Sequence, residues 1–359
     1  MHPVARAAVT AAAVALVGAV ALTLRSLNAF GVFTDVVPGF AGTCSAVAGV
    51  TGPEDIAIDE KSGLAFVSAL DRRAKARGKP AAQDGLYVMA LSGAAHLTKL
   101  AGTPADFHPH GISLVRGGDG TLTLMAINHR SDGSSSVDIF DVVAKPGGAI
   151  ALTEMGSIRS ELLVSPNAIA AFDADRFYVT NDHASTTAFG RMLDDDLALP
   201  RANVLYFDGT VFRLVADRLV FPNGVVLSAD GKYLYVTESY SRRLDTYERE
   251  PISGRLDPAG TLAIPSNLDN LRRDAAGNLW IGTHPKAFAM AAYRNDPAQP
   301  APSQVFKVTL AGGIPQSATA VYTNLGDQIG ASSVAAVTGN RLLIGSPFDN
   351  HILDCTMDH

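Results

Sequence analysis

Six polar residues recur along the chain at intervals of 46 to 63 residues, each at the start of a short apolar run. They are Glu54 in "PEDIAI", His110 in "PHGISL", Asn167 in "PNAIAA", Asn223 in "PNGVVL", Asp269 in "LDNLRR" and Ser332 in "ASSVAA". Asp55 and Asn270 follow directly after two of them. Carboxylate and carboxamide oxygens are ligands that calcium prefers, and the set contains no cysteine to favour zinc or copper. If the fold brings these positions together, the set predicts a calcium site; a solvated polar funnel is the alternative.

A second series of apolar segments alternates with the first. These segments are "LAFVSA", "LMAINH", "FYVTND", "YLYVTE", "LWIGTH" and "LLIGSP". Strand pairs repeated at a period of roughly 50 residues are typical of a propeller, in which each blade is a small antiparallel sheet. The innermost strands line a central channel, so equivalent strand starts converge at one mouth. We therefore predict an all-β chain that folds as a six-bladed β-propeller, with the polar residues around one end of the channel.

The composition agrees with this fold and excludes some classes of function. The chain has 359 residues, of which 47% are hydrophobic and 33 are glycines, which suits many short strands and turns around a large core. The formal net charge of −6, without any interleaving of basic and aromatic residues, argues against nucleic-acid binding. We expect residues 27–359 to form one catalytic propeller domain.

The N-terminus differs from the rest of the chain. The segment "AAVTAAAVALVGAVALTL", residues 7–24, carries no charge and lies between Arg6 and Arg25. It is just long enough to cross a bilayer as a helix, so residues 1–26 predict a signal-anchor, with a cleaved signal peptide as the alternative. Either interpretation makes the propeller extracytoplasmic, anchored to the membrane or secreted. One arginine on each flank leaves the orientation open.

The chain contains only two cysteines, Cys44 and Cys355, at opposite ends of the predicted globular part. One interpretation is a pair of inert buried thiols. The other is a disulfide, because the two ends of a propeller must meet to close the ring. We favour the disulfide, which also agrees with export to an oxidising compartment.

Eight segments resemble the serum paraoxonase/arylesterase family in their order and spacing. They are "GPEDIAID", "FHPHGISL", "INH", "FYVTNDH", "FPNGVVLSADGKYLYVTE", "LDN", "LWIGTHP" and "SSVAAVTGNRLLIGSPF", and they extend over nearly all of the predicted globular part. The resemblance implies a six-bladed propeller with calcium in its central channel, which hydrolyses lactones and aryl esters. It also implies an uncleaved N-terminal hydrophobic segment and a disulfide between the two ends.

The resemblance further implies roles for particular residues. The catalytic calcium is expected to be held by Glu54, Asn167, Asn223, Asp269 and Asn270. The catalytic histidine pair is expected at His110 and His129. Contacts with the substrate are expected at Phe221, His284 and Phe348. The remaining histidines are interpreted as structural, with His183 as a residue that supports the site.

These parts predict a metal-assisted hydrolysis. A calcium ion with an open coordination position polarises an ester or lactone carbonyl and stabilises the oxyanion that forms when water attacks. Histidine titrates near neutral pH, so His110 is the predicted base for that water, with His129 orienting it or relaying its proton. Asp269, beside the metal, is the rival base.

One position departs from the family in a way that affects the metal content. The family holds a second, structural calcium with an aspartate directly after the ligand asparagine, but Ala168 stands there in this chain. The other expected ligands, Asp55 and the backbone carbonyl of Ile112, remain. We expect this second site to be empty or weak, with Asp55 taking another partner such as an arginine. Alternatively, Asp182 replaces the missing carboxylate.

A second departure concerns the substrate. The basic segment "SALDRRAKARGKPAA", residues 68–82, replaces an active-site loop of the family, so the family's substrate preferences do not transfer. The absence of a Gly-x-Ser-x-Gly motif argues against a serine hydrolase of the α/β type. The alternatives that stay open are a gluconolactonase-like or strictosidine-synthase-like propeller, and a non-enzymatic binding propeller that calcium stabilises.

Overall fold

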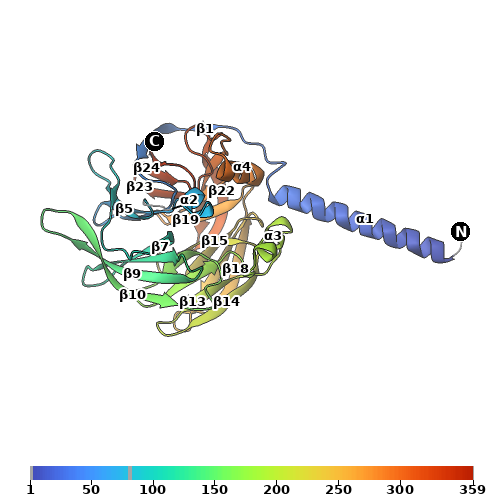
Figure 1. Ribbon diagram of the computed structural model, residues 1–359, viewed down its shortest axis with the longest axis horizontal. Helices are drawn as coiled ribbons and strands as arrows, with labels where there is room; N and C mark the ends of the chain where they lie inside the picture. The colour runs from blue at the N-terminus through green and yellow to red at the C-terminus, as the bar shows by residue number, and fades with distance from the viewer. Residues whose placement is uncertain (1–2, 80–82, 359) are drawn as a thin grey trace.

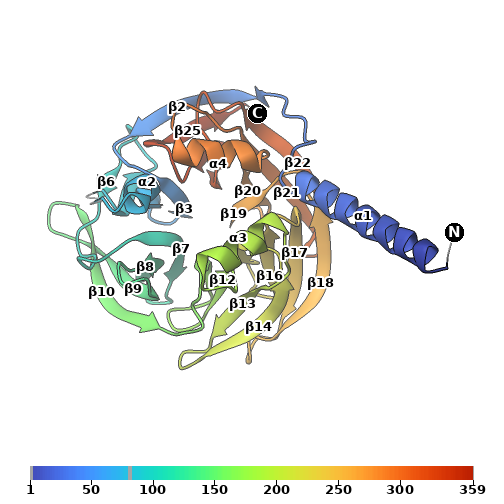
Figure 2. The ribbon, with the colours of Figure 1, turned by 45° about the vertical axis from the view of Figure 1, so that its right-hand side comes forward.

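The computed structural model describes residues 3–79 and 83–358. Its strands form six antiparallel sheets. Figure 2 shows these sheets as blades arranged in a ring, with helix α1 (Pro3–Ala29) extending away from it. The predicted fold, a six-bladed β-propeller with an N-terminal hydrophobic helix, is confirmed.

The blades follow one another along the chain, each starting with its innermost strand. The first blade contains β3 (Pro53–Asp59), β4 (Leu64–Ala69), β5 (Gly85–Ala90) and β6 (Thr98–Lys99). The second contains β7 (Pro109–Arg116), β8 (Leu122–His129), β9 (Ser135–Ala144) and β10 (Ile150–Arg159). The third contains β11 (Pro166–Ala171), β12 (Phe177–Asn181), β13 (Ala202–Phe207) and β14 (Phe212–Leu219).

The last three blades include the two N-terminal strands. The fourth blade contains β15 (Pro222–Leu227), β16 (Tyr233–Glu238), β17 (Arg243–Arg249) and β18 (Leu256–Ala263). The fifth contains β19 (Leu268–Arg273), β20 (Leu279–Thr283), β21 (Ser303–Ala311), β22 (Ile314–Asn324) and β1 (Gly39–Phe40). The sixth contains β23 (Val334–Thr338), β24 (Arg341–Gly345), β25 (His351–Met357) and β2 (Gly42–Ala48). Three short helices, α2 (Arg72–Ala76), α3 (Ala188–Asp196) and α4 (Ala287–Asn295), lie in the connections between strands (Figure 1).

Neighbouring inner strands contact one another around the whole ring. The contacts run from β3 to β7, β11, β15, β19 and β23, and from β23 back to β3. Apolar side chains fill the spaces between the blades, and Phe66, Tyr178 and Tyr235 are among the largest that are fully buried. Burial of this apolar surface is the main favourable term in folding, and it holds the inner strands in a fixed arrangement.

The polar residues of the sequence pattern lie where the inner strands begin and where pairing with the next strand is interrupted. The register shifts between Pro53 and Asp55, Pro109 and Ile112, Pro166 and Ile169, Pro222 and Val225, and Leu268 and Leu271. An interruption of this kind frees residues from the ladder and changes the direction of their side chains. This explains why a polar residue follows a proline at the head of an apolar strand.

Gly224 shows how closely these strand starts approach each other. A Cβ atom at this position would lie 2.8 Å from Cα of Asn270 and 2.8 Å from the carbonyl oxygen of Asp269. Only glycine leaves room for that approach, so the "PNG" of β15 brings Asn223 next to the Asp269–Asn270 pair of β19.

The ring is closed by the N-terminal part of the chain. Strand β2 pairs with β25 in the last blade, and Cys44 lies directly opposite Cys355 in that register. The two cysteines form the predicted disulfide across a sequence separation of 311 residues. The last blade therefore depends on the pairing of both ends of the chain.

Helix α1 projects from one side of the ring (Figure 1). Its segment Thr10–Ala29 is long and apolar enough to cross a membrane by length and composition, and within it only Ala29, at its end, is buried. The chain following the helix is tied to the propeller, since Asn267 Nδ2 donates to the carbonyl of Ala29 at 2.6 Å and the backbone of Ala287 donates to that of Phe30. The helix ends at Ala29, three residues beyond the predicted end of the anchor segment.

The disulfide generates a prediction about stability. Replacing both Cys44 and Cys355 with serine removes a cross-link over almost the whole ring, so the unfolded chain gains conformational freedom. We expect the free energy of unfolding of the propeller to fall by up to about 5 kcal/mol in the chain-entropy description. Chemical denaturation of oxidised wild type and double variant measures the difference, and equal midpoints would contradict it. A Ser45→Ala variant in the same strand is the control.

Candidate active site

The five predicted calcium ligands lie at the starts of four inner strands. Glu54 belongs to β3, Asn167 to β11, Asn223 to β15, and Asp269 and Asn270 to β19, and all five side chains are buried. Asn270 Nδ2 donates to Glu54 Oε1 at 3.3 Å across the channel mouth. Glu54 and Asn270 are therefore in contact, and all five side chains lie buried at the starts of inner strands.

Four oxygen atoms of this group are buried without any hydrogen-bond partner. They are Oδ1 of Asn167, Asn223, Asp269 and Asn270. Leaving one buried acceptor unsatisfied costs roughly 1–3 kcal/mol, so four at one mouth indicate a missing positive partner. The donors are two carboxylates and three carboxamides, which is the oxygen set that fits calcium. Among the described residues, no group of three or more His, Cys, Asp or Glu side chains is arranged to hold a metal, and the five predicted ligands include only two carboxylates.

The charges at the channel mouth also indicate a need for a positive partner. Burial, together with the nearby Glu54 carboxylate, raises the pKa of Asp269 well above its ordinary value. Burial acts against ionisation of Glu54 as well, but His110 and Arg72 outweigh it and hold the pKa of Glu54 at about 2. Two buried carboxylates therefore compete for the available positive charge, and a divalent cation would neutralise both.

The two predicted catalytic histidines are in contact. His110 Nδ1 lies 2.9 Å from His129 Nε2, and His110 Nε2 lies 2.9 Å from Glu54 Oε1. His129 Nδ1 lies 3.2 Å from Ser135 Oγ. Burial, with the nearby His110 and Lys75, lowers the pKa of His129 well below its ordinary value. His110 thus lies between a carboxylate of the ligand group and a second imidazole that is held neutral.

The three predicted substrate contacts lie in different surroundings. His284 is buried with Nδ1 3.5 Å from Asp269 Oδ2, and burial lowers its pKa to about 4. Phe221 packs edge-on against His183 and Tyr240, with ring centroids 5.0 Å apart in each case. Its φ of 51° is uncommon for a residue other than glycine.

Phe348 is buried to the same degree as His284. Its ring is buried, and the guanidinium of Arg73 lies 5.3 Å from its centroid. Of the predicted substrate contacts, only His284 directly approaches the ligand group.

His183 contacts two carboxylates beside the ligand group. It lies 2.7 Å from Asp182 Oδ1 through Nδ1 and 3.0 Å from Asp195 Oδ1 of α3 through Nε2. Burial opposes its charge, but the two carboxylates raise its pKa to about 9. Asp182 Oδ2 in turn accepts from Asn167 Nδ2 at 3.0 Å, which fixes the amide so that Oδ1 is the free atom. Asp182 and His183 belong to the sequence fragment "TNDH", but only the folded structure shows that they orient the amide of Asn167.

The basic segment 68–82, whose residues 80–82 lie outside the described residues, contains helix α2, which contacts two of the predicted site residues. Asp71 caps helix α2 by accepting from the backbone of Ala74. Arg72 donates to Glu54 Oε2 at 2.9 Å, and Lys75 donates to the carbonyl of His129 at 2.8 Å. The arginines and lysine of "RRAKA" therefore fasten α2 to the predicted site, a role that local pattern did not reveal.

The predicted second calcium site holds an arginine side chain. Arg272 NH2 donates to Asp55 Oδ2 at 2.5 Å and to the carbonyl of Ile112 at 3.0 Å, and its Nε donates to the carbonyl of Ile56 at 2.6 Å. Burial raises the pKa of Asp55 against the opposing effect of Arg272. Asp182, the alternative source of a carboxylate, instead accepts from Asn167 and Ser165. The residues at this position, with Ala168 beside them, do not fit a metal ion.

Comparisons with known proteins agree with the resemblance. The profile of the arylesterase family matches residues 47–357. Serum paraoxonase/arylesterase 1 of Rattus norvegicus is 31% identical over 330 residues, covering 90% of each chain. Serum paraoxonase/arylesterase 2 of Gallus gallus is 31% identical over 349 residues, covering 94% of this chain and 96% of the relative.

Solved structures with much lower identity share the fold. A luciferin-regenerating enzyme is 13% identical with a TM-score of 0.55, covering 88% of this chain and 95% of its own. The calcium-binding protein regucalcin from Agrobacterium tumefaciens is 15% identical with a TM-score of 0.52, covering 90% and 97%. The profile match and the paraoxonase relatives, together with the propeller and its end-to-end disulfide, show that this chain is an enzyme of the arylesterase family.

Proposed function

We propose that this protein is a calcium-dependent hydrolase of aryl esters and lactones, with His110 as its general base. The observation that carries the proposal is the group of four unpartnered, buried oxygens at the channel mouth, next to the contact between His110 and His129. The names of the relatives, serum paraoxonase/arylesterase, support the class of substrate. A panel of aryl esters, lactones and aldonolactones, assayed with chelator and then with added calcium, tests the class directly.

When bound by Glu54, Asn167, Asn223, Asp269 and Asn270, calcium would supply a Lewis acid for the carbonyl of the substrate. The protein's own groups move the proton. Glu54 Oε1, 2.9 Å from His110 Nε2, accepts a hydrogen bond from that nitrogen, so the proton of the attacking water goes to His110 Nδ1 and Glu54 stabilises the resulting imidazolium. His110 Nδ1 lies 2.9 Å from Nε2 of His129, which shares that proton, and Ser135 orients His129 from its far side.

Membrane anchoring through α1 forms a second part of the proposal. The segment Thr10–Ala29 has the length of a membrane-spanning helix, and only its last residues, from Arg25 on, contact the propeller. Phe33, just beyond the helix, and Phe288 on α4 are large exposed apolar residues next to it. We infer that α1 remains as a signal-anchor, with residues 27–359 as the extracytoplasmic catalytic domain. The alternative is a signal peptide that is removed.

The first functional prediction concerns the metal ligands. Asp269→Ala or Asn270→Ala removes one oxygen ligand, so turnover of an aryl ester should fall by about 100-fold or more, as when one electrostatic stabiliser is lost. Turnover and circular dichroism are measured on each variant, and Asp257→Ala, on the exposed outer strand β18, is the control. Wild-type turnover in either ligand variant would show that the site is assigned wrongly.

The second prediction concerns the base. His110→Gln keeps the size and polarity of the side chain but cannot accept the proton, so turnover should fall by about 100-fold or more. His96→Gln, at an exposed position, is the matched control. If His110→Gln retains near-normal turnover while Asp269→Asn does not, the carboxylate is the base and the histidine pair is not.

The third prediction concerns the metal content. Because Arg272 occupies the second site, the dialysed protein should retain one calcium per chain, measured by elemental analysis. Two retained ions would contradict this. Arg272→Met leaves Asp55 buried without its cation and should lower the free energy of unfolding by about 3–5 kcal/mol. Arg273→Met, an exposed neighbour, is the control.

A double variant sharpens the same test. Ala168→Asp combined with Arg272→Met replaces the guanidinium with a second carboxylate beside Asp55 and the carbonyls of Ile56 and Ile112. These are oxygen ligands for calcium, so the double variant should retain two ions and recover stability when calcium is added. A single ion in this variant would mean that Arg272 does not stand in place of a metal.

A further inference from the structure

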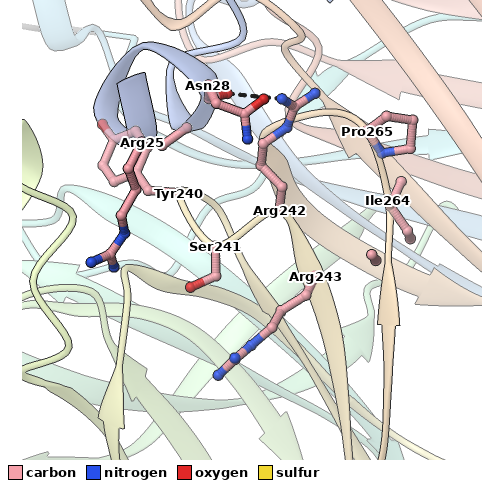
Figure 3. A pocket seen from close by; sticks show the side chains of 10 residues that line it. Arg25, Asn28, Tyr240, Ser241, Arg242, Arg243, Ile264 and Pro265 are labelled. Atoms are coloured by element: carbon pink, nitrogen blue, oxygen red, sulfur yellow. Dashed lines mark hydrogen bonds between the residues drawn. The ribbon is translucent and has the colours of Figure 1, made fainter. Parts of the chain in front are cut away.

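A cavity of about 680 Å³ lies away from the channel mouth, between the last turn of α1 and the propeller. Figure 3 shows it enclosed by Arg25 and Asn28 of α1, by residues 240–243 between β16 and β17, and by Ile264 and Pro265. None of the predicted catalytic, substrate-binding or metal-binding residues lines it. Its volume is typical of a site for a small ligand.

Three arginines line this cavity, and two of them have no acidic partner among the described residues. Arg243 is paired with Glu238 and Asp245. Arg242 donates only to the carbonyl of Asn28 at 2.8 Å and to Thr34 Oγ1 at 2.7 Å, and its buried Nε has no partner. Arg25 reaches only the carbonyl of Ala198, at 3.3 Å. The cavity therefore has an excess of positive charge.

The burial of Arg242 makes that excess costly. Desolvation lowers the pKa of its guanidinium, because no carboxylate offsets the loss of water. Its backbone has a φ of 55°, which is uncommon for a residue other than glycine. An anionic ligand in the cavity would offset the desolvation, and guanidinium groups pair with phosphate oxygens through two parallel hydrogen bonds.

The position of the cavity indicates where such an anion comes from. The charge-free segment, residues 7–24, ends directly before Arg25, and at 1.5 Å per residue its 18 residues are about 27 Å long, close to the thickness of the hydrocarbon core. With that segment in the bilayer, Arg25 and Asn28 lie at its boundary, where a long basic side chain extends toward the headgroups. The cavity that they line would then face the lipid phosphates.

We propose that this cavity binds the phosphate headgroup of an anionic phospholipid in the membrane leaflet from which α1 emerges. The inference rests on the proposed membrane anchoring. Bound there, the headgroup would join the helix to the propeller through Arg25 and Arg242 and hold the catalytic domain at a fixed height above the bilayer. A purely structural role, in which Arg242 only caps the C-terminal carbonyls of α1, is the competing explanation.

Lipid retention tests the proposal on the full chain. The protein is reconstituted in vesicles of phosphatidylcholine and phosphatidylglycerol, extracted in mild detergent, and its retained lipids are measured by mass spectrometry. Wild type should be enriched in phosphatidylglycerol relative to the vesicles. Arg25→Gln and Arg242→Gln should each reduce that enrichment by about fivefold, the contribution of one basic residue at an anionic membrane. Arg255→Gln, in the exposed turn at the other end of β17, should leave it unchanged.

The variants separate the two explanations. Arg25→Gln keeps the contact between Arg242 and α1, so a loss of phosphatidylglycerol in this variant supports headgroup binding, whereas a loss in Arg242→Gln alone supports capping and overturns the proposal. Equal enrichment in wild type and both variants also overturns it. Inorganic phosphate is added in a parallel sample. If it binds at the cavity in wild type without any lipid enrichment, the site takes a soluble anion and the lipid proposal is wrong.

Failure of the anchor gives a different result from failure of the cavity. An alkaline carbonate wash of neutral phosphatidylcholine vesicles measures membrane insertion without any anionic lipid. Protein released by the wash refutes the membrane anchor and the lipid proposal that rests on it. Protein that stays in the membrane but shows no enrichment refutes only the headgroup site. Unchanged aryl ester turnover confirms that both arginine variants are folded.

Discussion

Two buried carboxylates, Glu54 and Asp269, meet at one mouth of the propeller channel, and the arrangement of the site depends on how their charge is balanced. Burial disfavours both charges, and the Glu54 carboxylate raises the pKa of Asp269 further. In the structure, His110 and Arg72 stabilise Glu54, whereas Asp269 keeps an unpartnered oxygen. The same requirement for positive charge therefore connects the proposed metal ligands, His110 and helix α2.

The chain meets the need for buried positive charge in two different ways within one channel. At the mouth, amide and carboxylate oxygens are left without partners, as for a metal ion. One residue further along β3, Asp55 is neutralised by the side chain of Arg272. A guanidinium donates hydrogen bonds in one plane, so it satisfies a carboxylate and two carbonyls without a coordination shell. The charge of Asp55 is thus balanced by a side chain of the protein itself.

Residues outside the ligand group hold it in position. Asp182 and His183 orient the amide of Asn167, and α2 places Arg72 and Lys75 against Glu54 and His129. These supports come from the connections between the second and third strands within single blades, whereas the predicted ligands come from the inner strands. The propeller thus supplies a fixed ring of strand starts, and the connections hold the side chains at that ring in position.

The sequence by itself determined the features that repeat. The period of the strand pairs predicted six blades, the polar residues before each apolar run predicted the ligand group, and ring closure predicted the bond between Cys44 and Cys355. Tertiary structure alone decided which partner each buried charge takes. Arg272 reaches Asp55 from 217 residues away, and Arg72 reaches Glu54 from a helix without a repeating pattern. Periodicity records which face of a strand is buried, but the reach of a long side chain depends on neighbours that only the closed ring brings together.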